Sequence, residues 1–236
     1  MEQMENNVSL YEQVFLQKNP GETLHPGGLA LTQYALDLCA LQKGSRILDL
    51  GCGAGSSVQY LHKRGYAAVG VDLSALLLQA GYKRNSSLSF LQGDAGFLPL
   101  SSGQMDAILI ECSLSVFPDP DKVLQECQRI LRKEGLLILT DLYSRNPSGL
   151  PDLQAHFPSS CLANSMIQEK LLKQLSKHGF LETNWEDHSE VMKSFSGQSV
   201  LQSFACTAEQ TIDSLEAFLT IVHARLGYFL CIAKKC

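Results

Sequence analysis

The chain has 236 residues, of which 45% are hydrophobic, and its formal net charge is -5. This length can bury one sheet together with the helices that cover it, so we expect a single domain over residues 1–236. An acidic chain lacks the clustered Lys and Arg that nucleic acid phosphates require, so no nucleic acid partner is expected. The one basic cluster, Arg129 to Lys133, is interpreted as the end of a helix, where cations are favoured.

No stretch approaches the ~20 apolar residues that span a bilayer. The first residues, Met1 to Asn7, are acidic and polar and lack the apolar centre of a signal peptide. We therefore expect a cytoplasmic protein without a membrane span. The eight cysteines include no Cys-x-x-Cys pair, so we expect them to be reduced and expect no metal site.

Residues 1–43 are expected to be helical. Tyr11 to Leu16 predicts a short helix, and a second helix is expected after His25, with Pro26 near its first turn, through Leu41. We expect these helices to form a lid at the carboxyl edge of the sheet, with Tyr11 able to close over a bound ligand.

An apolar strand that begins at Arg46 runs directly into the Asp-x-Gly-x-Gly-x-Gly turn of residues 49–55. Glycine at every second position lets the backbone approach a ligand closely. A dinucleotide site has Gly-x-Gly-x-x-Gly over a pyrophosphate, but here Ser56 replaces the last glycine. Asp49 at the mouth of the turn suits a cationic group. The turn therefore favours a nucleotide-type ligand with a cationic group and disfavours an NAD-dependent dehydrogenase.

Two further strands are expected to end in carboxylates at the same edge. Ala68 to Val71 leads into Asp72, whose carboxylate can accept two hydrogen bonds from a ribose diol. Leu88 to Leu91 is followed by Gln92, Gly93, Asp94 and Ala95, which could hold the edge of an adenine ring. The pattern indicates an adenosine-type ligand.

The next elements continue the alternation of strand and helix. Gln104 to Ile110 predicts a fourth strand and Glu134 to Asp141 a fifth. The helix between them is expected to open at Pro118, Asp119 and Pro120 and to carry apolar residues at helical spacing: Val123, Leu124, Cys127, Ile130 and Leu131.

These strand-end segments, in this order and spacing, resemble the class I S-adenosylmethionine-dependent methyltransferases, most closely the small-molecule branch that includes the quinone-ring methyltransferases. The resemblance covers about residues 26–143. It implies an α/β fold: a doubly wound, seven-stranded Rossmann-like sheet with an antiparallel last strand. It also implies S-adenosylmethionine as cofactor, with S-adenosylhomocysteine as product. Residues 44–143 would then form the cofactor-binding core.

The resemblance assigns roles position by position. The implied cofactor-binding residues are Asp49, Gly51, Gly53, Gly55, Asp72, Asp94, Ala95, Glu111 and Cys112. We also expect Cys52, Leu73 and Tyr11 to contact the cofactor. Many relatives carry a histidine pair where this chain has Ser113 to Phe117, so a base must come from elsewhere. The catalytic candidates are Glu111, Tyr143 and His25, with Asp141 beside them; Glu111 could instead hold backbone amides or the cofactor, and His25 could only shape its turn.

Residues 144–236 are expected to complete the sheet. Met166 to His178 predicts an amphipathic helix, Phe180 to Trp185 a strand, and Tyr228 to Ala233 the antiparallel last strand. Between the two strands we expect a helical insertion at about 190–226, with a capping box at Thr207 and a stop signal at Gly227. It would form a cap on the acceptor side or a dimer surface.

Three functions remain open. The first is an enzyme that transfers a methyl group to a small-molecule acceptor, working as a monomer or homodimer. The second is a sensor or assembly module that binds the cofactor without catalysis, since function depends on the site rather than the fold. The third is a thiol or metalloid (arsenite) methyltransferase, because Cys161 and Cys206 could face the acceptor while Cys52 and Cys112 flank the cofactor site.

Overall fold

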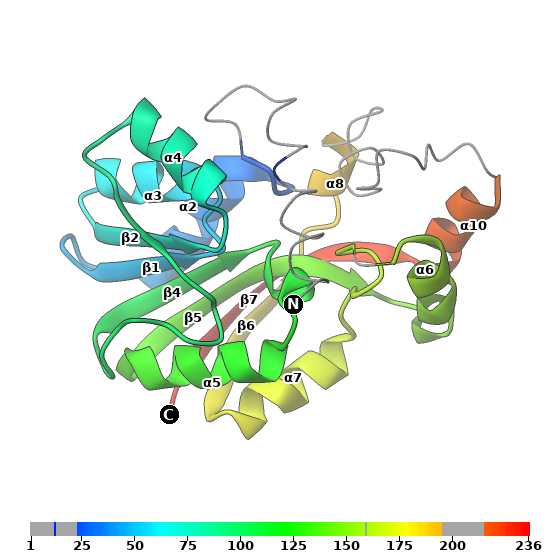
Figure 1. Ribbon diagram of the computed structural model, residues 1–236. Coiled ribbons are helices and arrows are strands. Elements are labelled where there is room, and N and C mark those ends of the chain that lie inside the picture. The colour runs from blue at the N-terminus through cyan, green and yellow to red at the C-terminus, as the bar shows by residue number, and fades with distance from the viewer. Residues whose placement is uncertain (1–11, 13–22, 159, 195–214) are drawn as a thin grey trace.

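The computed structural model describes Glu12 and residues 23–158, 160–194 and 215–236. These residues form a seven-stranded sheet in the order β3-β2-β1-β4-β5-β7-β6, with helices on both faces (Figure 1). The strands are β1 (Arg46–Leu50), β2 (Ala67–Asp72), β3 (Ser89–Gln92), β4 (Met105–Glu111), β5 (Leu131–Ser144), β6 (Phe180–Asp187) and β7 (Leu226–Lys235).

The pairing confirms the predicted fold class. β1 to β5 pair in parallel, whereas β7 runs antiparallel to β5 and β6. β1 pairs with β2 on one side and with β4 on the other, so the strand order reverses at β1. In open α/β sheets ligands bind outside the carboxyl ends of the strands at such a switch point. A ligand site is therefore expected at the segments that follow β1, β2 and β4.

The helices form two layers (Figure 1). α2 (Gly28–Cys39), α3 (Ser56–Lys63) and α4 (Ala75–Arg84) lie on one side of the sheet, and α5 (Pro120–Ile130) and α7 (Gln168–Lys177) lie on the other. At one end of the sheet α10 (Leu215–Ala224) packs against α6 (Leu150–His156). The remaining short helices are η1 (Leu114–Val116), η2 (Pro147–Gly149) and α8 (Val191–Ser194).

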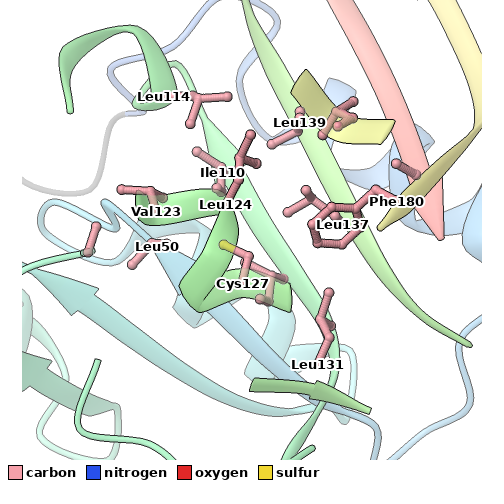
Figure 2. Close-up of a cluster of buried hydrophobic side chains, with 14 of the residues drawn as sticks. Leu50, Ile110, Leu114, Val123, Leu124, Cys127, Leu131, Leu137, Leu139 and Phe180 are labelled. Carbon is pink, nitrogen blue, oxygen red and sulfur yellow. The ribbon is translucent and has the colours of Figure 1, made fainter. Parts of the chain in front are cut away.

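Alternation along the strands divides the core between the two faces. Ile47 and Leu109 pack with α2 and α3, whereas Leu50 and Ile110 pack with α5 on the opposite face. Figure 2 shows part of this second cluster, in which Leu124 of α5 lies against strand side chains. Because successive strand residues point to opposite faces, one continuous apolar run serves both layers.

Two boundaries differ from the sequence prediction. Leu131 was expected in a helix, but α5 ends at Ile130 and Leu131 pairs with Met105 as the first residue of β5. The basic cluster was expected at the end of the helix, but of its basic residues only Arg129 lies in α5. Arg132 lies beyond α5, with its Nε 2.6 Å from Asp106 Oδ1. The backbone of Leu131 is already extended, so helical hydrogen bonding cannot continue.

The helix expected to lie over the ligand packs mainly on the sheet. α2 buries Leu31, Thr32, Ala35 and Leu36, and Ala35 and Leu36 belong to the core against β1 and β4. Its beginning reaches the carboxyl edge. Of the predicted helix from Tyr11 to Leu16 the structure describes Glu12 alone, and Tyr11, the predicted lid residue, lies outside the described residues.

The insertion is described in part. α8 and α10 are helical as expected, whereas residues 195–214, including the predicted capping box at Thr207 and Cys206, lie outside the described residues. The predicted stop at Gly227 is wrong: α10 ends at Ala224, Arg225 takes the left-handed φ of 49°, and Gly227 already belongs to β7. A Cβ on Gly227 would lie 2.5 Å from Tyr143 Cε1, so close packing is what requires glycine there. Within the described ranges, no helix has the length and apolar character needed to cross a membrane.

Candidate functional site

The three glycines after β1 have different surroundings. All have positive φ, at 78° for Gly51, 54° for Gly53 and 73° for Gly55. A Cβ on Gly51 would lie 2.6 Å from Ser113 Oγ, and one on Gly55 would lie 2.4 Å from the Phe90 ring. A Cβ on Gly53 would meet no described atom within 4 Å. Gly51 and Gly55 thus allow the turn to pack, whereas Gly53 is where its backbone is open to a ligand.

Asp49 supplies an unpaired carboxylate beside this opening. Its side chain is buried, and Oδ2 has no hydrogen-bond partner among the residues that the structure describes. Burial raises its pKa well above the usual range, and the nearby carboxylates of Glu111 and Asp72 raise it further. A buried carboxylate without a partner is costly. The site is therefore complementary to a cationic group and unfavourable for a diphosphate.

Asp72, at the end of β2, closes the turn from the other side. Its Oδ2 accepts a hydrogen bond from Gly53 N at 2.8 Å, and its Oδ1 accepts one from Ser74 N at 2.9 Å. Burial nevertheless raises its pKa. Each carboxylate oxygen has a second lone pair, so Asp72 can still accept from a ligand diol. Glu12 lies nearby, since its Oε1 accepts from Ser74 Oγ at 2.5 Å.

Cys52 contributes to the turn through its backbone. Its N donates to Val71 O at 3.1 Å. A Cβ on Gly70 would lie 2.6 Å from Cys52 Sγ, so the thiol packs against β2 beneath the turn. Among the predicted cofactor-binding residues, Cys52 therefore uses its side chain for packing.

The segments after β2 and β3 meet at the same edge, as predicted. Gly93 N donates to Asp72 O at 3.0 Å, and Gln92 Nε2 donates to Leu73 O at 3.1 Å. Asp94 Oδ1 accepts from Gly96 N at 2.8 Å, which fixes the turn that carries the buried Ala95. Leu73 is 37% exposed, so an apolar side chain is available beside the carboxylates of this edge.

Glu111, at the end of β4, is held by hydroxyl groups from two helices. Thr32 Oγ1 donates to its Oε1 at 2.7 Å, and Ser57 Oγ donates to its Oε2 at 2.5 Å. The carboxylate is buried and ties α2 and α3 to the strand end. Sequence reasoning did not identify Thr32 and Ser57. Ser57 had a signal, because it directly follows the glycine turn, but nothing local marks Thr32.

His25 lies against Glu111. Its Nε2 is 3.4 Å from Glu111 Oε2, within ion-pair distance but without hydrogen-bond geometry, and it has no other partner among the described atoms. Its Nδ1 is 3.3 Å from Pro26 O, and a carbonyl oxygen only accepts, so that contact requires a proton on Nδ1. The structure thus brings together two of the three catalytic candidates as a buried histidine–carboxylate pair.

Tyr143 is not brought to this pair. Its hydroxyl accepts from Arg145 Nε at 3.0 Å, and its ring packs edge to face against Trp185 with centroids 5.8 Å apart. Burial raises the pKa of the phenol. Tyr143 therefore belongs to the aromatic cluster at the β5–β6 end of the sheet, on the face opposite α2.

Asp141 positions the segment after β4. Its carboxylate accepts from Ser115 N at 2.9 Å, Ser115 Oγ at 2.8 Å and Leu142 N at 2.7 Å. Burial raises its pKa to about 6. These bonds hold η1, which lies in the Ser113 to Phe117 segment, where the sequence comparison above noted a histidine pair in many relatives.

The comparison with known families concerns the residues that contain these strand ends. The family described as "Methyltransferase domain" matches residues 48–139. The uncharacterized methyltransferase YodH of Bacillus subtilis is 31% identical over 166 residues, which are 67% of this chain and 70% of YodH. The chain belongs to the class I S-adenosylmethionine-dependent methyltransferases.

Within this family the quinone branch is represented. The demethylmenaquinone methyltransferase of Thermotoga maritima is 32% identical over 103 residues, which are 43% of this chain and 45% of that enzyme. The match thus spans less than half of that relative's length.

A solved methyltransferase shares the fold. Phosphoethanolamine N-methyltransferase 2 of Haemonchus contortus, in complex with S-adenosyl-L-methionine, has a TM-score of 0.71 and 18% identity, over 97% of this chain and 56% of that one. The residues of this methyltransferase fit the same cofactor: Asp49 Oδ2, which has no partner among the described residues, can accept from a cation, and Gly53 leaves the turn open.

Proposed function

We propose that this methyltransferase transfers a methyl group from S-adenosylmethionine to a small-molecule acceptor. The observation that carries the proposal is the buried Asp49 Oδ2, which lacks a partner among the described residues and lies at the open glycine turn. The cofactor's amino acid end carries an ammonium, which would satisfy that oxygen. When bound, the cofactor supplies a methyl group already activated on a sulfonium. The quinone-type relative supports a small organic acceptor.

The remaining cofactor contacts are assigned to residues at the same carboxyl edge of the sheet. Asp72 accepts from the ribose hydroxyls with the lone pairs that Gly53 and Ser74 leave free. Leu73, Asp94 and Ala95 hold the adenine, because their segments are fixed beside Asp72 by hydrogen bonds. Gly51, Gly53 and Gly55 shape the turn, and Glu111 and Cys112 lie at the strand end that faces the acceptor.

His25 and Glu111 are the acid–base group of this proposal. Methyl transfer depends chiefly on alignment and exclusion of water, and a base is needed only when the acceptor loses a proton. His25 is buried beside a carboxylate that is anchored by Thr32 and Ser57. Glu111 faces the imidazole with its Oε2 3.4 Å from Nε2, and His25 is the group that would move a proton. Tyr143 is omitted because its hydroxyl bonds to Arg145 in a different cluster.

Calorimetric titration tests the cofactor site. The full chain is titrated with S-adenosylmethionine, S-adenosylhomocysteine and NAD as the control. Asp72→Asn removes charge from a hydrogen-bond acceptor and is expected to weaken binding about 10- to 150-fold. Asp106→Asn is the matched control, because Asp106 pairs with Arg132 away from the carboxyl edge. Equal affinity in the folded Asp72 variant would refute the ribose assignment.

Turnover separates the enzyme from a module that only binds the cofactor. Production of S-adenosylhomocysteine in the presence of small-molecule acceptors supports catalysis. Cofactor binding without turnover, across an acceptor screen that includes quinols, phenols, amines and thiols, would favour the hypothesis of a sensor or assembly module. The cytoplasmic location and the monomeric or homodimeric state are part of the same proposal.

A further inference from the structure

Arg84, the last residue of α4, holds the glycine turn from the side of that helix. Its Nη2 donates to Ala54 O at 2.8 Å, and its Nε donates to Gln59 Oε1 at 3.2 Å. Ala54 lies within the turn and Gln59 lies on α3, so one guanidinium joins three segments. Arg84 and Ala54 are 30 positions apart in the chain, and the proposed function leaves Arg84 without a role.

The contact is close because α4 lies directly against the turn. A Cβ on Gly81 would lie 2.5 Å from Ala54 O, so the absence of a side chain at Gly81 lets the helix approach this carbonyl. Ala54 also packs with Leu77 of α4 in a small apolar cluster. Helical side chains point back toward the start of their helix, so Arg84 reaches past Gly81 to the same carbonyl. One helix thus fixes Ala54 by packing and by hydrogen bonding.

The guanidinium of Arg84 has two satisfied nitrogens and one unsatisfied nitrogen. Both acceptors are neutral, a backbone carbonyl and a side-chain amide. The third nitrogen, Nη1, is buried and has no partner among the described residues. A charged donor forms a stronger hydrogen bond than a neutral one, whereas a buried donor without a partner is destabilising. The two effects oppose each other, so Arg84 orders one carbonyl with little net gain in global stability.

The carbonyl that Arg84 holds belongs to the part of the turn that is open to a ligand. Ala54 O and Gly55 N are in the same planar peptide group, so fixing the oxygen also fixes the N–H. Gly55 N donates to Cys52 O at 2.8 Å. Arg84 and Cys52 therefore hold opposite sides of one peptide group. The backbone of Gly53, which meets no described atom at its Cβ position, lies directly before this group.

We propose that Arg84 is a positioning residue for S-adenosylmethionine, because it holds the glycine turn in the conformation that receives the methionine end of the cofactor. Arg84 acts through the turn. It therefore contributes to binding of the methionine end rather than of the adenosine end, which is assigned to Asp72 on β2. This role rests on the proposed cofactor site, whereas the hold of Arg84 on the turn does not.

Calorimetric titration with two ligands separates the two ends of the cofactor. S-adenosylhomocysteine carries both ends, whereas methylthioadenosine lacks the amino acid end. Arg84→Met removes the donors and keeps an apolar stem. It is expected to weaken S-adenosylhomocysteine binding about 10-fold and methylthioadenosine binding less than about 2-fold. A general loosening of the fold would weaken both alike.

Two further variants sharpen the comparison. Arg84→Lys keeps the charge but loses the fork that reaches two acceptors at once, so its affinity for S-adenosylhomocysteine is expected between those of the unmodified chain and Arg84→Met. Arg64→Met is the matched control, because Arg64 pairs with Asp37 at 2.8 Å at the far end of α3. This control is expected to bind both ligands like the unmodified chain.

Amide hydrogen exchange tests the hold on the turn without any ligand. In Arg84→Met the Gly55 amide is expected to exchange about 10-fold faster, because the peptide group loses one of its two anchors. The amides of β1 and the midpoint of urea unfolding are expected to change little.

Three results would overturn the proposal: unchanged exchange at Gly55, equal loss of affinity for both ligands, or full affinity of Arg84→Met for S-adenosylhomocysteine. If the unmodified chain binds neither ligand, the proposed cofactor site fails and the role of Arg84 in cofactor binding fails with it. Faster exchange at Gly55 in that case would still support the hold of Arg84 on the turn.

Discussion

Asp49→Asn separates two effects of the Asp49 carboxylate: it destabilises the ligand-free chain, and it strengthens cofactor binding. The substitution keeps the shape of a buried side chain whose Oδ2 has no partner among the described residues. Burial, then Glu111 and Asp72, raise the pKa of the carboxyl, so ionisation is unfavourable in the folded chain. We therefore expect the free variant to be more stable than the natural chain at pH 7 but to bind S-adenosylmethionine less tightly.

The two effects have opposite signs and similar magnitudes. Removing a buried charged group that lacks a partner is worth about 1–3 kcal/mol, reduced by any new amide donor left unsatisfied. Losing a charged hydrogen bond to the ligand's ammonium costs about 1.5–3 kcal/mol, which corresponds to about 10- to 150-fold in dissociation constant. A general packing defect would lower both stability and affinity.

Urea unfolding without ligand and calorimetric titration measure the two quantities. The raised pKa means that the folded state binds the proton more tightly than the unfolded state. The stability of the natural chain then falls as pH rises above about 4, and the advantage of the variant grows over that window. In the control Asp106→Asn, the lost carboxylate accepts from Arg46 N and pairs with Arg132, so stability should fall while affinity is kept. A less stable Asp49 variant with unchanged affinity would refute the reasoning.

Further predictions concern the glycine turn and Asp141. Gly55→Ala is expected to destabilise the chain by about 2–4 kcal/mol in urea unfolding, because its Cβ would overlap the Phe90 ring and its φ is left-handed. Gly53→Ala should lower stability by only about 1 kcal/mol yet clearly weaken S-adenosylhomocysteine binding. If Gly53→Ala were the more destabilising of the two variants, the backbone at Gly53 would not be open to a ligand. The pKa of Asp141, raised to about 6, should make stability fall by about 2–3 kcal/mol between pH 4 and pH 7. A pH slope that is unchanged in Asp141→Asn would argue against this group.

The strands and the cofactor edge could be predicted because their signals are local. The strand from Arg46 was placed correctly, and the antiparallel last strand proved longer than predicted but in the expected place. Element ends were less predictable. Leu131 continues the apolar spacing of α5, yet it pairs with Met105, because strand pairing outweighed helical propensity at that boundary.

Side-chain contacts at the site could not be predicted in the same way. Tyr143 and His25 both looked available near strand ends, but the alternation of β5 sends the Tyr143 ring into the cluster with Trp185 and Phe229. His25 reaches Glu111 because α2 packs its buried stripe on the sheet and brings its beginning to the edge.

The sequence by itself determined the doubly wound fold, the glycine turn and the row of carboxylates at the strand ends. The turn and the carboxylates follow from residue types next to one another in the chain, which report on local backbone geometry, and the fold follows from the resemblance that these segments carry. Tertiary structure alone decided that Thr32 and Ser57 hold Glu111, and that His25 lies 3.4 Å from the same carboxylate. Such contacts join segments far apart in the chain, and their partners are chosen by how helices pack across the sheet, which leaves no periodic signal in either segment.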